Sequence, residues 1–438
     1  MPKIVQTKIV QTAVNSYWST SDSETVRLYW GDVIEILRNL DSRSVQMVVT
    51  SPPYWGLRNY RTETAEGDKQ LGIEVVPDCL GWSRKENCAS CYICKMVLVF
   101  RQVKRVLRMD GTLWLNMGDS YGGRIDKRKL YETEFPCNAG YDECYARKII
   151  QGTSGGTVEL DVRWNSGLAK GNLVGIPWRL ALALQADGWI LRQDIIWHKP
   201  STMPESITNR CTKAHEYIFL LAQSQSYYYD AESIKTDATP ACRVVTEKYG
   251  SYAQALSMGV NPSGNGKLGS VVRTGNKANK RSVWTISNEG YSGKHYAAFP
   301  SKLIEPCILA GTSEYGACKE CGRPYKRVVE SIPLKRERPN KYVKRTGEEG
   351  TGNSCDNSVD GVETRTVGWK QCCDCNTEEV RPCIVLDPFI GSGTTALVCL
   401  DHDRWCWGID LNKDYLDNQV VVRVRGRLYS RPGLAYLL

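Results

Sequence analysis

The chain has 438 residues, of which 42% are hydrophobic and 18 are cysteines, and its formal net charge is +9. These values are typical of a globular protein with one large core domain and smaller additions, and the charge fits a phosphate-bearing partner without requiring one. The sequence contains no apolar run near the roughly 20 residues that cross a bilayer, and no secretory h-region opens it. We therefore expect a cytoplasmic protein with no membrane partner. Its cysteines are expected to be metal ligands or small buried hydrophobes, not a disulfide framework.

The predicted elements alternate along the chain between short apolar strands and helices. A polar arm over 1–25 precedes them, and two Gly-rich polar stretches, 121–170 and 231–282, interrupt them. The first of these stretches is long enough to be a functional lid. The alternation predicts an α/β fold with a doubly wound, mostly parallel sheet. We expect strands at 26–30, 45–50, 111–117, 189–197, 217–221, 383–386 and 405–409, and helices at 33–40, 96–107, 176–187, 303–310 and from 396.

The strand at 45–50 ends abruptly at Ser51-Pro52-Pro53-Tyr54, at the strand end where open α/β sheets bind ligands. This turn suits an exocyclic base amine, whose lone pair is delocalised into the ring. The Ser51 hydroxyl and the Pro52 carbonyl are suitable acceptors for the two N–H groups, and they would stabilise the charge that develops on attack. Tyr54 offers a flat face to a base flipped out of the duplex. Taken alone, the turn is equally typical of a strand terminator with an aromatic plug.

A first cysteine-rich segment follows the turn. It has the pattern CxxCxxC at Cys88, Cys91 and Cys94, with Cys79 as an outlying fourth residue. Four thiolates suit zinc. The run also resembles part of an iron–sulfur motif, although its fourth cysteine stands on the wrong side for the ferredoxin pattern. Free cysteines are the other interpretation, so the sequence leaves this second possible metal site open.

A second group of cysteines consists of two pairs separated by about fifty residues. Cys318-x-x-Cys321 precedes a glycine, and Cys372 with Cys375 forms a second CxxC, in which Cys373 is an alternative to Cys372. Two such pairs would supply the four thiolates of a closed, structural zinc site. A closed site has no open coordination position, so we expect it to have no catalytic role.

The segment 385–400 is the strongest single signal for a cofactor. A buried strand runs into a turn containing Gly391 and Gly393, and a helix follows, which lets backbone N–H groups approach a ligand. This segment contains neither GxGxxG nor GxxxxGK[ST], which favours a nucleoside over a nucleotide phosphate. Asp410 ends the next strand, at the distance expected for an acid that binds ribose hydroxyls. Asp32 also ends a strand, but alone it is more typical of a turn or helix cap.

Together these segments resemble the amino-methylating DNA methyltransferases of restriction–modification systems, in prokaryotes or phages. The catalytic segment precedes the cofactor glycines, which is the permuted beta arrangement of the Rossmann-like methyltransferase fold. The resemblance covers most of residues 26–420. Its segments, in the family's order, are GD at 31–32, TSPPYW at 50–55, GTLWLNMGDS at 111–120, HEYIFLL at 215–221, HYAAFPSKLIEPCI at 295–308 and DPFIGSGTT at 387–395.

The resemblance implies roles for residues that match the family's motifs. Ser51, Pro52, Pro53 and Tyr54 would be catalytic, and S-adenosyl-L-methionine would be the cofactor. The residues implied to bind it are Asp32, Phe299, Pro300, Asp387, Phe389, Gly391, Gly393, Thr394 and Asp410.

The resemblance also implies a division of the chain. The inserted region would recognise the target in double-stranded DNA, with its basic residues on phosphates. The expected parts are an arm over 1–25, a catalytic half over 26–230 with inserts at 79–94 and 121–170, a target-recognition region over 231–283, and a cofactor-binding half over 284–438 with a zinc-knuckle insertion over 316–380.

The expected activity is site-specific transfer of a methyl group to cytosine N4, because Ser stands first in the SPPY turn. Adenine N6 is the alternative, since adenine-specific relatives more often have Asp or Asn there. A homodimer and a cognate restriction endonuclease are further partners the resemblance allows. The rival interpretations are an RNA or protein methyltransferase, a zinc-ribbon nucleic-acid binder with an inactive methyltransferase core, and a dehydrogenase, whose GxGxxG is missing from the glycine turn after the strand at 383–386.

Overall fold

The computed structural model describes the parts of the chain that form the core and most of the predicted sites. The predicted polar arm, the loop at 121–170 and the target-recognition region lie largely outside it. Among the described residues, no helix is both long and apolar enough to span a bilayer. The described residues are 17–20, 25–56, 70–74, 76–122, 168, 171–237, 277–289, 299–333 and 362–430.

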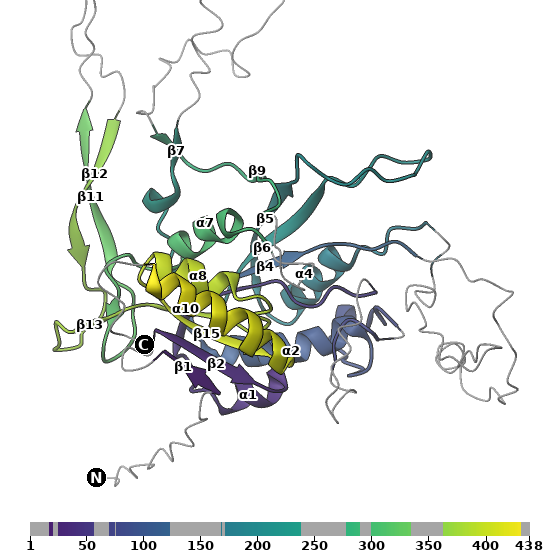
Figure 1. The fold of residues 1–438 in the computed structure, drawn as a ribbon. Coiled ribbons are helices and arrows are strands. Elements are labelled where there is room, and N and C mark those ends of the chain that lie inside the picture. The colour runs from purple at the N-terminus through teal and green to yellow at the C-terminus, as the bar shows by residue number, and fades with distance from the viewer. Residues whose placement is uncertain are drawn as a thin grey trace, which may run out of the picture. The chain divides into compact units, whose positions relative to one another are not determined.

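A nine-stranded sheet forms the core, with strand order β1-β2-β15-β14-β3-β4-β6-β5-β9 (Figure 1). The strands from β2 to β4 in that order are parallel, whereas β6 is antiparallel to both of its neighbours. The predicted doubly wound, mostly parallel sheet is therefore confirmed. Its strands are β1 Trp18–Ser19, β2 Val26–Trp30, β3 Val45–Thr50, β4 Leu107–Met117, β5 Ile190–His198, β6 His215–Ala222, β9 Val283–Thr285, β14 Ile384–Asp387 and β15 Trp405–Asp410.

Two groups of helices pack against the sheet. In one group α2 lies between α1 and α4, and in the other α8 lies between α7 and α10. On β4, Leu113 and Leu115 join the core beneath the first group, whereas Thr112 lies near Gly311 of α7, as expected when successive residues face opposite sides of a strand. The helices are α1 Val33–Asn39, α2 Tyr92–Val106, α4 Ile176–Ala186, α7 Ser301–Gly311, α8 Thr394–Asp401, α9 Lys413–Tyr415, the π-helix Leu416–Val421 and α10 Val422–Tyr429.

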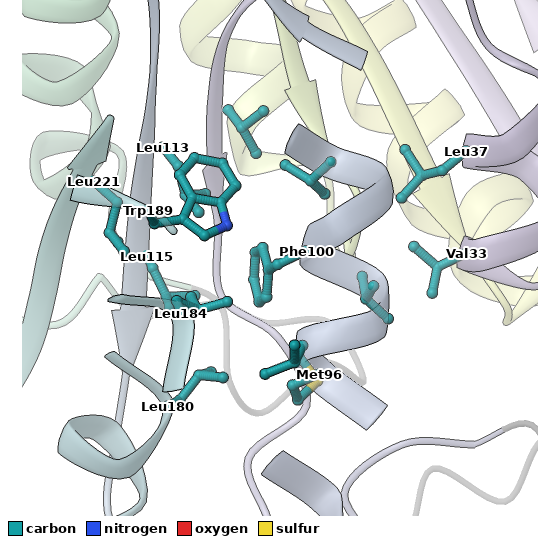
Figure 2. Close-up of a cluster of buried hydrophobic side chains, with 14 of the residues drawn as sticks. Val33, Leu37, Met96, Phe100, Leu113, Leu115, Leu180, Leu184, Trp189 and Leu221 are labelled. Carbon is teal, nitrogen blue, oxygen red and sulfur yellow. The ribbon is translucent and has the colours of Figure 1, made fainter. Parts of the chain in front are cut away.

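Helix α2 is the centre of the larger hydrophobic core. Figure 2 shows Phe100 of α2 directed toward Trp189, Leu184 and the strand residue Leu115. Phe100 has no exposed surface, and full burial of such a side chain contributes about 1.5–3 kcal/mol. This packing fixes the middle of α2 against the sheet.

Most predicted elements are present, with shifted boundaries. The helix expected to begin at 96 begins at Tyr92, because the Cys91 sulfur accepts the Cys94 N–H and caps it. The helix expected from 396 begins at Thr394, immediately after the left-handed Gly393. The C-terminal helices after Asp410 were not predicted, although apolar residues recur there every four positions at Leu416, Val420, Val424 and Leu428.

A second compact unit consists of 230–281 and 326–371. Its described elements are the short strands β7 Thr236–Asp237 and β8 Lys277–Ala278, the 3-10 turn Glu232–Ile234, and a hairpin of β11 Lys326–Pro333 and β12 Val362–Lys370. The sequence-based division kept 316–380 together as one insertion. In the structure its middle belongs to this second unit, while the flanking residues belong to the core unit.

Candidate active site

The predicted catalytic turn and the predicted cofactor loop begin at neighbouring strand ends. Strands β3 and β14 pair in parallel, so their carboxyl ends lie at one edge of the sheet. The Thr50 hydroxyl, one residue before the turn, donates to Asp387 Oδ1 at 2.7 Å, and the Thr395 hydroxyl donates to Oδ2 at 2.6 Å. One carboxylate thus joins the strand before the turn to the helix after the loop.

The Asp387 side chain is held by protein partners on both of its oxygens. It has no exposed surface, and besides the two hydroxyls it accepts the Phe389 N–H at 3.1 Å. Burial raises its pKa to about 6, although these three donors lower it. Its side chain therefore faces the protein and holds the loop in place, and a contact with the cofactor would have to come from its neighbours.

The turn itself contains a network of polar groups centred on Tyr54. The Ser51 hydroxyl donates to Tyr54 Oη at 3.1 Å, and Tyr54 Oη lies 2.8 Å from Glu216 Oε2 and 3.0 Å from Asn116 Oδ1. A phenol has one proton, so Tyr54 donates to one of these two acceptors, and the carboxylate is the stronger. Lys199 pairs with the other oxygen of Glu216.

Sequence reasoning missed the partners of Tyr54. Asn116 and Glu216 lie inside two segments quoted for the resemblance, but nothing in the local pattern gave them a role. Asn116 on β4 and Glu216 on β6 meet because these strands pair antiparallel. Gly118 is a further support, since a Cβ there would lie 2.6 Å from Cε2 of the Tyr54 ring. Only glycine therefore leaves room for the ring in this position.

The backbone of the turn is anchored from a separate segment. The Tyr92 hydroxyl, at the start of α2, donates to the Pro53 carbonyl at 2.8 Å. The buried Trp55 donates through Nε1 to the Glu74 carbonyl at 2.8 Å. The turn is thus held from both sides of Tyr54, while Ser51, Pro53 and Tyr54 remain half-buried and Pro52 is buried.

The cofactor loop is shaped by its two glycines. Gly391 and Gly393 have φ of 51° and 81°, in the left-handed region that side chains disfavour. A Cβ on Gly393 would also lie 2.8 Å from Val420 Cγ1. Arg423 of α10 donates to the Ser392 carbonyl at 2.6 Å. The C-terminal helices therefore clamp the loop against α8.

Asp410 lies beside this loop, as predicted from its spacing. Its Oδ2 accepts the Gly391 N–H at 3.0 Å, and its Oδ1 accepts the Asn412 N–H at 2.8 Å. Desolvation raises its pKa to about 7, although the N–H donors lower it. Each carboxylate oxygen has a second lone pair, so the group can still accept hydrogen bonds from a diol.

The remaining predicted cofactor residues are at element boundaries. Asp32 follows β2, which pairs with β15, and its Oδ1 caps α1 by accepting the N–H groups of Ile34 and Glu35 at 2.9 and 3.0 Å. Thr394 is the buried first residue of α8. Pro300 is the buried cap of α7, and Phe299 before it is half-buried. Helix α7 packs against β3 and α8.

The cysteine pairs after α7 meet, with one correction. The sulfur atoms of Cys318, Cys321, Cys373 and Cys375 all lie within 4.8 Å of one another. The preferred choice of Cys372 was wrong and its alternative Cys373 is the residue brought in. Side chains two residues apart on a non-helical chain can face the same way, whereas the adjacent one points elsewhere. The Cys372 carbonyl instead accepts from Arg323 at 2.6 Å.

This cluster is attached to the amino end of β3. Gln46 donates through Nε2 to the Gly322 carbonyl at 2.9 Å and accepts the Ile384 N–H at 2.7 Å. Arg108 donates to the Cys321 carbonyl. The first cysteine group also gathers, because the sulfurs of Cys79, Cys88, Cys91 and Cys94 lie within 4.8 Å of one another.

Comparison with known proteins decides the family. A model of N6/N4 DNA methylases matches residues 45–318 and 381–421. The type II methyltransferase M.SmaI of Serratia marcescens is 34% identical over 90% of this chain and 89% of its own. This chain belongs to the N6/N4 DNA methyltransferase family. M.Cfr9I of Citrobacter freundii, another type II methyltransferase, is 31% identical over 89% of this chain and 85% of its own.

Family membership confirms the resemblance and the permuted Rossmann-like methyltransferase fold, and it sets aside the RNA, protein and dehydrogenase interpretations. Among solved structures, PvuII DNA methyltransferase (cytosine-N4-specific) is similar with a TM-score of 0.46 and 14% identity, over 96% of this chain and 92% of its own. The family model leaves out 319–380. Most of the second cysteine group and the hairpin of this methyltransferase are therefore additions to the family core.

Proposed function

We propose that this DNA methyltransferase transfers the methyl group of S-adenosylmethionine to N4 of cytosine in double-stranded DNA. The observation that carries the proposal is the hydrogen bond between Thr50 and Asp387, because it ties the strand before the SPPY turn to the strand before the glycine loop. A base amine at the turn and a cofactor on the loop would then meet at one edge of the sheet.

The turn supplies acceptors for a base amine. Ser51 directs its proton to Tyr54, so the lone pairs of its oxygen are available to an N–H group. The Pro52 carbonyl is the second acceptor, and the proline nitrogens offer no competing donor. Two acceptors on the amine oppose delocalisation of its lone pair and stabilise the positive charge that develops on nitrogen.

The product amine must lose one proton, and the chain offers a path for it. As the N–CH₃ bond forms and the S–CH₃ bond breaks, the amine proton passes to Ser51, the Ser51 proton to Tyr54, and the Tyr54 proton to Glu216. The ion pair with Lys199 keeps Glu216 oriented. S-Adenosylmethionine supplies an activated methyl group, so no covalent base intermediate is needed. The enzyme then mainly has to align the base amine with the methyl group.

The residues around the glycine loop fit the cofactor. Asp410 would accept the ribose hydroxyls, and Gly391 and Gly393 allow close approach of the backbone. Asp32 and the Phe299-Pro300 pair would close the adenine side. Cys318, Cys321, Cys373 and Cys375 would hold a structural zinc, since four thiolates within tetrahedral reach form a closed site.

Adenine N6 is the second candidate, because both bases carry an exocyclic amine. The serine at the start of the turn favours cytosine, as the resemblance implies. The test is methylation of phage DNA with labelled S-adenosylmethionine, followed by mass spectrometry of the nucleosides. We expect N4-methylcytosine, and N6-methyladenine would overturn the choice of base. RNA and protein substrates serve as controls and should stay unlabelled.

The division of roles is tested by removing the two polar side chains of the turn together. Ser51→Ala with Tyr54→Ala should lower kcat by at least about 10²-fold, because the amine loses an acceptor and the base its aromatic face. Calorimetric binding of S-adenosylmethionine should stay within about threefold of wild type. Loss of cofactor binding in this variant would show that the turn and the loop do not have separate roles.

A further inference from the structure

The cysteine group between the catalytic turn and α2 has the geometry of a metal site. The sulfurs of Cys79 and Cys94 lie 3.6 Å apart, and all four cysteines are free thiols. Four sulfurs placed about 2.3 Å from one zinc at tetrahedral angles would be separated by about 3.8 Å. An iron–sulfur cluster is larger than a single ion and would need its thiolates farther apart.

Backbone donors already point at three of the sulfurs. Gly81 N–H lies 3.3 Å from Cys79 Sγ, Cys91 N–H lies 3.3 Å from Cys88 Sγ, and Cys94 N–H lies 3.4 Å from Cys91 Sγ. Such N–H groups stabilise thiolates, the form that binds metal. Cys91 is also the cap of α2, where the helix dipole favours negative charge.

The segment that carries these cysteines has little packing of its own apart from Trp82, which lies against the core, and Asp78, which pairs with Arg179. Between Asp78 and Ser90 most side chains are exposed, and the only regular element is the 3-10 turn Gly81–Arg84. Three non-glycine residues there, Leu80, Lys85 and Ala89, have φ of 57°, 61° and 55°. Side chains disfavour this left-handed region of the backbone. Metal ligation can offset such strain, since the free energy of binding a structural metal contributes to folding.

The same segment ends at the residue that holds the catalytic turn. Tyr92 follows Cys91 directly, and its hydroxyl donates to the Pro53 carbonyl at 2.8 Å. The Tyr92 and Ile93 N–H groups donate to the Val76 and Pro77 carbonyls at 3.1 and 3.0 Å, so the chain before Cys79 is fastened to the same helix end. The position of Tyr92 therefore depends on how the first turn of α2 is anchored.

We propose that Cys79, Cys88, Cys91 and Cys94 bind one zinc ion, which fixes the start of α2 and, through Tyr92, the catalytic turn. The zinc is structural, because four thiolates leave no open position. Tyr92 is a positioning residue that acts on the base-binding turn through the Pro53 carbonyl. Its positioning role rests on the proposed function of that turn, whereas the metal site does not.

The metal site is tested by counting zinc in purified full-length protein by mass spectrometry. Cys88→Ser should contain one zinc fewer than wild type, and the matched control Cys211→Ser, an exposed cysteine outside both groups, should keep the wild-type count. An unchanged count in Cys88→Ser overturns the proposal, as does iron in place of zinc.

A second variant keeps the test decisive if Cys88→Ser does not fold. Of the two four-cysteine groups among the described residues, Cys375→Ser leaves the group at 79–94 complete, so this variant should contain one zinc. After exchange with cobalt it should show the visible absorption of tetrahedral cobalt–thiolate sites. A Cys375→Ser protein without zinc, or a cobalt spectrum without this absorption, overturns the proposal.

The positioning role is tested with Tyr92→Phe, which removes one hydroxyl and keeps the ring. We expect kcat to fall about tenfold because the turn loses its alignment, with the zinc count and the Kd for S-adenosylmethionine unchanged. The control Tyr429→Phe, at an exposed position, should match wild type. An unchanged kcat overturns the positioning role. Methylation of adenine instead of cytosine would overturn the choice of base in the proposed function. The kcat values of Tyr92→Phe, Tyr429→Phe and wild type would still test the positioning role of Tyr92.

Discussion

The two cysteine groups each bring four sulfur atoms together but are attached to opposite ends of strand β3. The group at 318–375 is linked to its amino end, through Gln46 and Gly322. The group at 79–94 is linked to the turn after its carboxyl end, through Tyr92 and Pro53. In α/β sheets the carboxyl ends of strands bind ligands. The position on the strand, and not the ligand set, should therefore decide whether loss of a metal affects chemistry or only stability.

The largest effect on kcat is expected from a change near the catalytic turn, at the carboxyl end of β3. Glu216→Gln keeps the shape of the side chain but removes the charge that accepts the Tyr54 proton and pairs with Lys199. We expect kcat to fall about 10²-fold, the lower end for loss of a proton acceptor. Single-turnover methylation measures it, with calorimetric binding of S-adenosylmethionine expected to stay at the wild-type level.

The matched control for this change is Glu305→Gln. Glu305 also has a side-chain partner, with its Oε1 2.9 Å from His402 Nε2, but lies on α7. It should retain wild-type turnover. Equal losses in the two variants would mean that Glu216 acts through general stability and not through the turn.

The next largest effect on kcat is expected when one cysteine is removed from each group in turn. Cys94→Ser and Cys375→Ser each remove one ligand, and each should lower the thermal midpoint, because structural metal sites contribute to folding. For protein that remains folded, Cys94→Ser should lower kcat at least about tenfold by releasing Tyr92, whereas Cys375→Ser should stay within about twofold. Similar kcat values in both variants would contradict the difference between the two ends of β3.

The sequence predicted the features that depend on neighbouring residues in the chain, such as turns and strand ends. The Ser51–Tyr54 turn and the Gly391–Gly393 loop each follow a strand, Asp410 ends one, and parallel pairing brings these strand ends together. The partners of Tyr54 were not predictable in this way, because Glu216 is 162 residues away in the sequence and meets Tyr54 only through the order of the strands. The choice between Cys372 and Cys373 depended on the path of a non-helical segment, which spacing does not encode.

Two further features depend on contacts between residues that are far apart in the sequence, namely the partners of Asp387 and the hairpin within 316–380. Asp387 belongs to the most specific motif of the chain, yet both its oxygens accept protein hydrogen bonds. The β11–β12 hairpin lies inside the expected insertion over 316–380, but its strands were interpreted as a polar loop because most of their residues are exposed and form no apolar run. In both cases the missing information was which side chains meet across long distances in the sequence.

A change of pH separates the cofactor loop from both cysteine groups. Burial raises the pKa of Asp410 to about 7, so the free enzyme takes up a proton there as the pH falls from 8 to 6. A protonated acid accepts ribose hydroxyls less well. Affinity for S-adenosylmethionine should therefore fall about five- to tenfold over this range and level off above pH 8.

Calorimetry in buffers of different ionisation enthalpy measures this effect and the proton released on binding below pH 7. Asp410→Asn should bind more weakly at pH 8 and lose this part of the pH dependence, while its zinc count stays that of wild type. An identical pH profile in Asp410→Asn would assign the titration to another group.

The smallest effect on chemistry is expected at the amino end of β3. Gln46→Leu leaves the Gly322 carbonyl and the Ile384 N–H without their partner in a buried site. This should lower the free energy of unfolding by about 2 kcal/mol, with turnover within about twofold and the zinc count unchanged. Urea unfolding and single-turnover methylation measure the two quantities, and Gln185→Leu on the exposed face of α4 is the control. If Gln46→Leu slowed methylation as much as Tyr92→Phe, a shift at one end of β3 would reach the other, and the strand would transmit strain between the metal sites instead of separating them.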